Sequence, residues 1–230
     1  MKKKSLIGSV TSLASMDNII AKDNLDDSDY KKSNFLNTEQ KKTYKINQVA
    51  AGHQHTFVLV NQKLFVFGRD IKGVLGVPAP SQFLQNPVRV QFPISHVQIQ
   101  GVSTQKSHAL AWDSNGKIYS WGESTGGKLG HQINLDTYVF DEVQDKPKLV
   151  EALMNEFIIQ AACGLNLSLA LNSNGEIFQW GKGIHSKQFP KEQVPSLVQA
   201  INPKKLEPKD LQGNPVKNVK FFKISCGYSH

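Results

Sequence analysis

The amino-acid sequence predicts an all-β fold built from one unit of short antiparallel strands that recurs along the chain. The clearest copy lies in residues 100–130, where two apolar runs flank Asp113-Ser114-Asn115-Gly116-Lys117. Asn-Gly between apolar runs indicates a β-hairpin, because both residues tolerate positive φ. The pair Trp121-Gly122 that follows recurs as Phe67-Gly68 and Trp180-Gly181, and the three glycines lie 54 and 59 residues apart. Landmarks in a fixed order at this spacing are typical of repeat architectures.

The chain before the repeats, residues 1–44, has neither a helical nor a strand period and is rich in Ser, Asn, Asp and Lys. Such a segment cannot bury enough apolar surface to offset its ordering entropy. We therefore expect a disordered polar tail, with a short helix around Met16 to Ala21. The run after Lys2 to Lys4 is too polar for the apolar region of a signal peptide, so a signal or transit peptide is the lesser alternative. No run approaches 18 apolar residues, which predicts no membrane span and favours a cytoplasmic or nuclear protein.

Four residues, which we call the slot, precede each hairpin. In the first copy the slot begins with glycine and ends with histidine. The paired positions are Gly52 and His55, Gln105 and His108, Gly164 and Leu167, and Gly227 and His230. The first hairpin, Phe57 to Val60 with Leu64 to Phe67, is apolar on both faces, as expected for a sheet covered on both sides. Its turn, Asn61 to Lys63, is one residue shorter than in the other copies. Period-2 alternation predicts the outer strands at Val88, Val90 and Phe92, and at Val97 and Ile99.

A glycine-rich loop follows the first two hairpins at the same offsets. Gly73, Leu75 and Gly76 match Gly127, Leu129 and Gly130. The third copy lacks this element, and the proline-rich residues 198–219 argue for an exposed loop. We therefore divide the repeat region, 45–230, into units of approximately 48–98, 99–158, 159–218 and a truncated unit 219–230.

The two cysteines and the net charge exclude some classes of site. Cys163 and Cys226 occupy equivalent repeat positions, so they point the same way in neighbouring units and we expect buried, reduced thiols without a disulfide. Neither has the closely spaced ligands of a metal site, and no cofactor is expected. The net charge of +8 comes from lysine, since Arg69 and Arg89 are the only arginines. Scattered lysines predict at most weak, unspecific binding to polyanions or chromatin.

Together, the slot, the Asn-Gly hairpin, the aromatic-Gly pair and the Gly-x-Leu-Gly loop resemble the repeats of the regulator of chromosome condensation family, over residues 48–230. The resemblance implies a β-propeller of four-stranded antiparallel blades. The family norm is seven blades, whereas this chain holds about three and the start of a fourth. Open sheet edges are normally covered, so the ring would need further repeats or another chain to close.

The resemblance implies that the motif residues are structural. Glycine allows close backbone approach, tryptophan packs between blades with an indole donor that needs a partner, and histidine bridges backbone groups of neighbouring strands. Leu167 in the slot favours this role over catalysis or metal binding. The structural repeat positions are Gly52, His55, Gly68, His108, Trp121, Gly122, Gly164, Trp180, Gly181, Gly227 and His230.

The resemblance implies a protein–protein interaction module or scaffold. The alternative is a guanine nucleotide exchange factor for a Ran-like small GTPase, the activity of the founding member. We expect no enzyme, because paired carboxylates, a nucleophile elbow and a phosphate-binding glycine loop are missing from the sequence. Candidate partner contacts are the polar residues directly after each aromatic-Gly pair, with solvated loop tips as the alternative. They are Arg69, Asp70, Glu123, Ser124 and Lys182.

Overall fold

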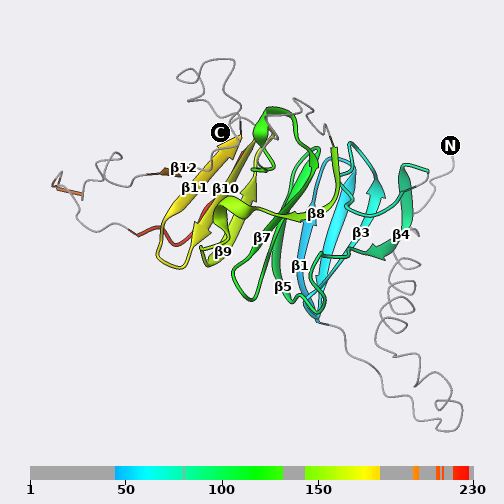
Figure 1. The fold of residues 1–230 in the computed structure, drawn as a ribbon, viewed down its shortest axis with the longest axis horizontal. Helices are drawn as coiled ribbons and strands as arrows, with labels where there is room; N and C mark the ends of the chain where they lie inside the picture. The colour runs from blue at the N-terminus through cyan, green and yellow to red at the C-terminus, as the bar shows by residue number, and fades with distance from the viewer. Residues whose placement is uncertain are drawn as a thin grey trace, which may run out of the picture.

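A computed structural model of the protein describes residues 45–79, 81–131, 143–181, 199–201, 211–212, 214 and 220–227, and arranges them as three antiparallel four-stranded sheets (Figure 1). The first sheet contains β1 (Ile46–Ala51), β2 (His55–Val60), β3 (Lys63–Arg69) and β4 (Phe83–Arg89). The second contains β5 (Ile99–Thr104), β6 (His108–Asp113), β7 (Ile118–Glu123) and β8 (Val143–Leu149). The third contains β9 (Ile158–Cys163), β10 (Leu167–Asn172), β11 (Ile177–Gly181) and β12 (Gln199–Ile201).

Each sheet is one blade, and its strands follow chain order from the inner to the outer edge. We call the sheets blades 1, 2 and 3. Two short 3-10 helices, η2 (Thr125–Gly127) and η3 (Glu151–Leu153), lie in the connections. The predicted all-β fold of four-stranded antiparallel blades is confirmed, whereas the predicted tail and its helix lie outside the described residues. No helix within the described ranges combines the length and apolar character needed to cross a membrane.

The three hairpins share one register. Gly68 pairs with His55, Gly122 with His108, and Gly181 with Leu167. One residue inward, the aromatic side chains also take equivalent positions: Phe67 opposite Thr56, Trp121 opposite Ala109, and Trp180 opposite Ser168. The repeat read from the sequence is therefore a structural repeat.

The hairpin turns differ from the expected geometry in one respect. In the turn after β6 Gly116 has φ 73°, whereas Asn115 does not take a positive φ. The Asp113 carboxylate closes this turn instead, since its Oδ1 accepts from the backbone amides of Asn115 and Lys117, both at 2.9 Å. Asn172 does the same after β10. The hairpin was predicted correctly, but its cause is an Asp or Asn side chain with one glycine.

The first hairpin is closed by a shorter turn. Asn61 and Gln62 have φ 47° and 64°, the two consecutive positive values of a two-residue hairpin turn.

The two predicted outer strands fit the structure only in part. β4 contains Val88 but ends at Arg89, so Val90 and Phe92 belong to the connection between blades. Val97 precedes β5, which begins at Ile99 and is the inner strand of blade 2. Phe92 instead packs edge-on against Tyr119 of blade 2, with ring centroids 5.1 Å apart. The period-2 pattern extended the strand too far there because Val90 and Phe92 both pack into the cluster between blades 1 and 2.

The start of a fourth unit occupies the place of the next inner strand. Phe221 N donates to Gly175 O at 3.0 Å, as Ile158 N donates to Gly116 O at 2.9 Å. Residues 220–227 are not assigned as a strand, although they take this place in the truncated unit.

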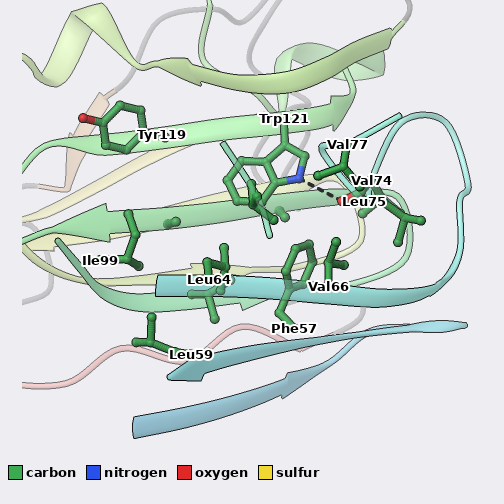
Figure 2. Close-up of a cluster of buried hydrophobic side chains, with 14 residues drawn as sticks. Phe57, Leu59, Leu64, Val66, Val74, Leu75, Val77, Ile99, Tyr119 and Trp121 are labelled. Carbon is green, nitrogen blue, oxygen red and sulfur yellow. Dashed lines mark hydrogen bonds between the residues drawn. The ribbon is translucent and has the colours of Figure 1, made fainter. Parts of the chain in front are cut away.

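The cores lie between the blades. Figure 2 shows Phe57, Leu64 and Val66 of blade 1 packed against Tyr119 and Trp121 of blade 2. A second cluster joins blades 2 and 3, and its buried members include Leu110, Ile118, Val150, Ile158 and Trp180. Because each blade buries its apolar faces against a neighbour, stability is shared between adjacent repeats.

Candidate functional site

Two sets of loops emerge at the same end of every blade. The first strand of each blade turns into the second beside the point where the third strand ends, as the pairing of His55 with Gly68 requires. We call this end the loop face; its described residues lie in 52–54, 69–82, 105–107, 123–131 and 164–166. The opposite end carries the hairpin turns at 61–62, 114–117 and 173–176, and we call it the hairpin face.

Four of the five predicted partner residues are described, and these leave the sheets at the loop face but differ in what their side chains do. Arg69 is exposed at the end of β3. Asp70 is half-buried, and its Oδ1 accepts from Leu75 N at 3.1 Å, which fixes the following loop. Ser124 precedes η2, and its carbonyl accepts from Gly127 N at 3.0 Å. Lys182 lies outside the described residues. The partner role of these residues stays a prediction.

Glu123 differs most from the expectation, because its carboxylate is engaged inside the chain. Its Oε2 forms an ion pair with Nζ of Lys128 and accepts from Ser107 Oγ at 2.7 Å. Burial opposes ionisation of Glu123, but the hydrogen bonds from Lys128 and Ser107 outweigh it, so the pKa of this carboxyl is lowered. Lys128 also donates to Asn166 Oδ1 of blade 3 at 3.5 Å.

The slot histidines join neighbouring blades. His55 Nε2 lies 2.7 Å from Thr104 Oγ1 of blade 2. Thr104 Oγ1 donates its only proton to His108 O at 3.2 Å, so it must accept from His55, whose proton is therefore on Nε2. The histidine was expected to bridge backbone groups; its partner is a hydroxyl of the next blade instead.

The second slot repeats this arrangement at the next junction. His108 Nε2 lies 3.0 Å from Ser168 Oγ of blade 3, and Ser168 Oγ donates to Lys128 O at 2.7 Å. By the same reasoning His108 carries its proton on Nε2. Each hydroxyl thus relays a hydrogen bond from the histidine of one blade to a backbone carbonyl.

Both imidazoles are neutral at physiological pH. Burial, with a smaller contribution from His53, lowers the pKa of His55 to about 4. Burial lowers the pKa of His108 to about 3, and the charge of Lys128 adds to this while Glu123 opposes it. A histidine that stays neutral and buried is suited to holding blades together and poorly suited to proton transfer at neutral pH.

The aromatic-Gly positions form the second kind of junction contact. Trp121 Nε1 donates to Val74 O at 2.8 Å, across from blade 2 to the loop of blade 1 (Figure 2). The ring lies over Gly76, where an added Cβ would approach Trp121 Nε1 to 2.6 Å. Trp180 lies over Gly130 in the same way, at 2.9 Å. The tryptophan of the following blade therefore packs on the Gly-x-Leu-Gly loop. The sequence did not reveal this contact.

The remaining motif glycines also lie where backbones meet. An added Cβ at Gly52 would lie 2.2 Å from His55 Nε2, and one at Gly164 would lie 3.1 Å from Gly227 O. Three glycines at the end of the third strand take positive φ: Gly68, Gly122 and Gly181. His230 lies outside the described residues.

Neither the cysteines nor the acidic side chains build a metal or redox centre in the part of the chain that is described. Cys163 and Cys226 are free thiols. Burial raises the pKa of Cys226 to about 11 and raises that of Cys163 further. No group of three His, Cys, Asp or Glu side chains among the described residues is placed to hold a metal ion.

Sequence reasoning missed the polar residues that pair with the motif. Thr104 and Ser168 follow no repeat pattern, because they stand at different repeat positions in adjacent blades. Lys128 gave a signal that could have been used: it stands next to Leu129 at the position where the first repeat has the apolar Val74. A charged residue at an apolar repeat position indicates a buried partner.

Comparisons with known proteins agree with the repeat architecture. The regulator of chromosome condensation (RCC1) repeat matches residues 115–171. The human E3 ubiquitin-protein ligase HERC2 is 36% identical over 142 residues, which cover 61% of this chain and 3% of HERC2. The Xenopus laevis protein RCC2 homolog is 30% identical over 144 residues, covering 58% of this chain and 23% of that protein. The chain thus spans a minor part of the length of these relatives.

Solved structures show the same fold. Human WBSCR16 is 22% identical with a TM-score of 0.64, over 82% of this chain and 44% of that one. Prp20p from Saccharomyces cerevisiae, described with its binding properties to Gsp1p and histones, is 20% identical with a TM-score of 0.59, over 80% of this chain and 42% of that one. The chain therefore matches the regulator of chromosome condensation repeat at residues 115–171 and shares the β-propeller fold of these solved structures.

Proposed function

We propose that this chain is part of a protein-interaction module that binds its partner through the loop face. The observation that carries the proposal is that basic side chains are exposed on that face, while its carboxylates are engaged within the chain. Arg69 and Lys106 are exposed, whereas the carboxylates of Asp70 and Glu123 are engaged by groups of the chain itself. The basic side chains therefore dominate what the described loop face presents, and they suit a partner with an acidic surface.

The relatives support a binding role within a larger product. Prp20p, which shares the fold, is described with its binding to Gsp1p and histones. HERC2 is named as an E3 ubiquitin-protein ligase, and only 3% of it matches this chain. A nuclear or cytoplasmic location and a chromatin-associated partner are parts of the same proposal.

Nucleotide exchange on a Ran-like small GTPase is the second candidate. It is favoured by the fold shared with Prp20p, for which binding to Gsp1p is named. It ranks below the binding role because an exchange role cannot be assigned to any residue in the described ranges.

A further blade is the second partner that we propose. Ile46 and Val49 lie in β1, on the face of blade 1 that points away from blade 2, and are 52% and 58% exposed. The equivalent Ile99 and Val102 of blade 2 are each 1% exposed. Blade 1 covers Ile99 and Val102, whereas no blade among the described residues covers Ile46 and Val49. The flank of blade 1 therefore has the composition of a blade junction, which a further repeat or another chain would cover.

Binding measurements with two probes test the proposed function. Nucleosomes, whose DNA presents an acidic surface, and Gsp1p are titrated onto the immobilised chain at several salt concentrations. Reversing the charge of Arg69 and Lys106 (R69E/K106E) is expected to weaken binding about tenfold or more. The control is K220E, which changes an exposed lysine next to the hairpin turn at Gly175. Its binding affinity should stay within about twofold of that of the unaltered chain.

Equal losses per reversed charge in R69E/K106E and K220E would show unspecific attraction by net charge and would contradict a binding face. Binding of neither probe by the unaltered chain would also count against the proposal. A parallel nucleotide-release assay on loaded Gsp1p separates the two candidates, because faster release caused by the chain would place exchange first.

A further inference from the structure

Lys128 is the most deeply buried charged side chain of the loop face. It is 1% exposed, and its ammonium group meets three oxygen atoms. Nζ donates to Glu123 Oε2, to Ser107 Oγ at 3.2 Å and to Asn166 Oδ1 at 3.5 Å. Three acceptors match the three protons of an ammonium group, so the charge is paired and hydrogen-bonded as burial requires.

These partners come from three different loops. Lys128 lies in the connection from β7 to β8, just after η2, and Ser107 lies in the connection from β5 to β6 of the same blade. Asn166 lies between β9 and β10 of blade 3. One ammonium group therefore ties two loops of blade 2 to a loop of blade 3.

The first repeat shows that the blade itself does not need this group. Val74 stands at the position of Lys128 and is fully buried, and Arg69 stands at the position of Glu123 and is exposed. The loop of blade 1 is fixed instead by Asp70, which accepts from Leu75 N. The charge cluster is thus specific to the junction of blades 2 and 3.

We propose that Lys128 is a positioning residue that locks the β7–β8 loop onto blade 3 and so fixes the loop face for its partner. The role in partner binding rests on the proposed function, whereas the locking of the loop does not. Removing one member of the cluster leaves a buried charge or polar group unpaired, and removing both members of the ion pair removes that penalty.

Hydrogen–deuterium exchange of the whole chain tests the lock without a partner. In K128M and in E123Q, we expect exchange of residues 123–130 and 164–167 to rise about tenfold or more, with β2 and β3 of blade 1 nearly unchanged. The double variant E123Q/K128M should recover part of the protection, and K128R should stay close to the unaltered chain.

The matched control is R69Q, which changes the position equivalent to Glu123 in the first repeat and should leave exchange in all three blades within about twofold. The proposal fails if K128M and E123Q leave the loops protected, or if exchange rises equally in blade 1. If K128M does not fold, E123Q and the double variant still decide it. Loss of loop protection with unchanged nucleosome and Gsp1p binding would keep the lock and reject its role in the proposed function.

Discussion

The junction between blades 1 and 2 and the junction between blades 2 and 3 share one register but use different chemistry. At the first junction, Trp121 donates to Val74 O and the surrounding cluster is apolar. At the second, Trp180 covers Gly130, but Lys128 O accepts from Ser168 and the indole Nε1 has no acceptor among the described residues. The repeat motif therefore sets the geometry of a junction, while residues outside the motif set its hydrogen bonds and charges.

Truncating the tryptophans should have the largest effect at both junctions. Trp121→Ala and Trp180→Ala each remove a buried ring and are expected to cost about 3 to 5 kcal/mol in the free energy of unfolding. Phe67→Ala, at the equivalent but half-buried position of blade 1, should cost only about 1 to 2 kcal/mol. Urea unfolding of the three variants measures this. Equal costs at all three positions would contradict the difference in burial between the blade 1 flank and the junctions.

Removing the slot histidine should have an intermediate effect. His108→Ala loses the hydrogen bond to Ser168 and leaves a cavity, with an expected cost of about 1 to 3 kcal/mol. Ser168→Ala breaks the same contact from blade 3, so the double variant should cost less than the sum of the two single changes. Thermal melts and urea titrations of the three variants test this coupling. An additive double variant would show that the two side chains do not interact.

Acid should weaken both junctions through the same histidines. The folded pKa values of His55 and His108, about 4 and about 3, lie below the ordinary value of 6.5, so the unfolded chain binds more protons as the pH falls. Their stabilising contribution is complete above pH 6.5 and is lost toward pH 4, by about 1 kcal/mol per histidine between pH 6.5 and 5.5. Urea unfolding at several pH values measures this slope.

A variant with leucine at both slots, as nature places Leu167 in the third, should have a shallower slope. If His55→Leu with His108→Leu leaves the pH dependence unchanged, other groups cause the acid sensitivity.

The smallest expected effect distinguishes the two indoles. Trp121→Phe loses the hydrogen bond to Val74 O and should cost about 1 kcal/mol more than Trp180→Phe, whose indole has no comparable acceptor. Parallel urea titrations compare the two variants. A larger cost for Trp180→Phe would show that its Nε1 has a partner in solution.

The blades could be predicted from the sequence because their signals are local and repeated. Asn115-Gly116 with its flanking apolar runs, and the aromatic-Gly pairs, fix the hairpins within about 20 residues of chain. The outer strands were harder to place, since Val90 and Phe92 continue the alternation of β4 beyond its end and pack into the cluster between blades 1 and 2.

The candidate site could be predicted only in part. The residues after each aromatic-Gly pair do reach one face, but whether a side chain is available there depends on partners that are distant in sequence. Glu123 is engaged by Lys128 and Ser107, and Lys128 in turn reaches Asn166 of blade 3, 38 residues away. A single sequence contains no pattern that links such residues, because a contact between blades follows from the fold.

Histidine side-chain NMR of the full chain tests most directly whether the motif histidines join blades instead of transferring protons. We expect His55 and His108 to show the proton on Nε2 and to stay neutral as the pH is lowered from 7 to 5, in keeping with pKa values of about 4 and about 3. Either histidine titrating near the ordinary value of 6.5, or carrying its proton on Nδ1, would contradict its place between the blades.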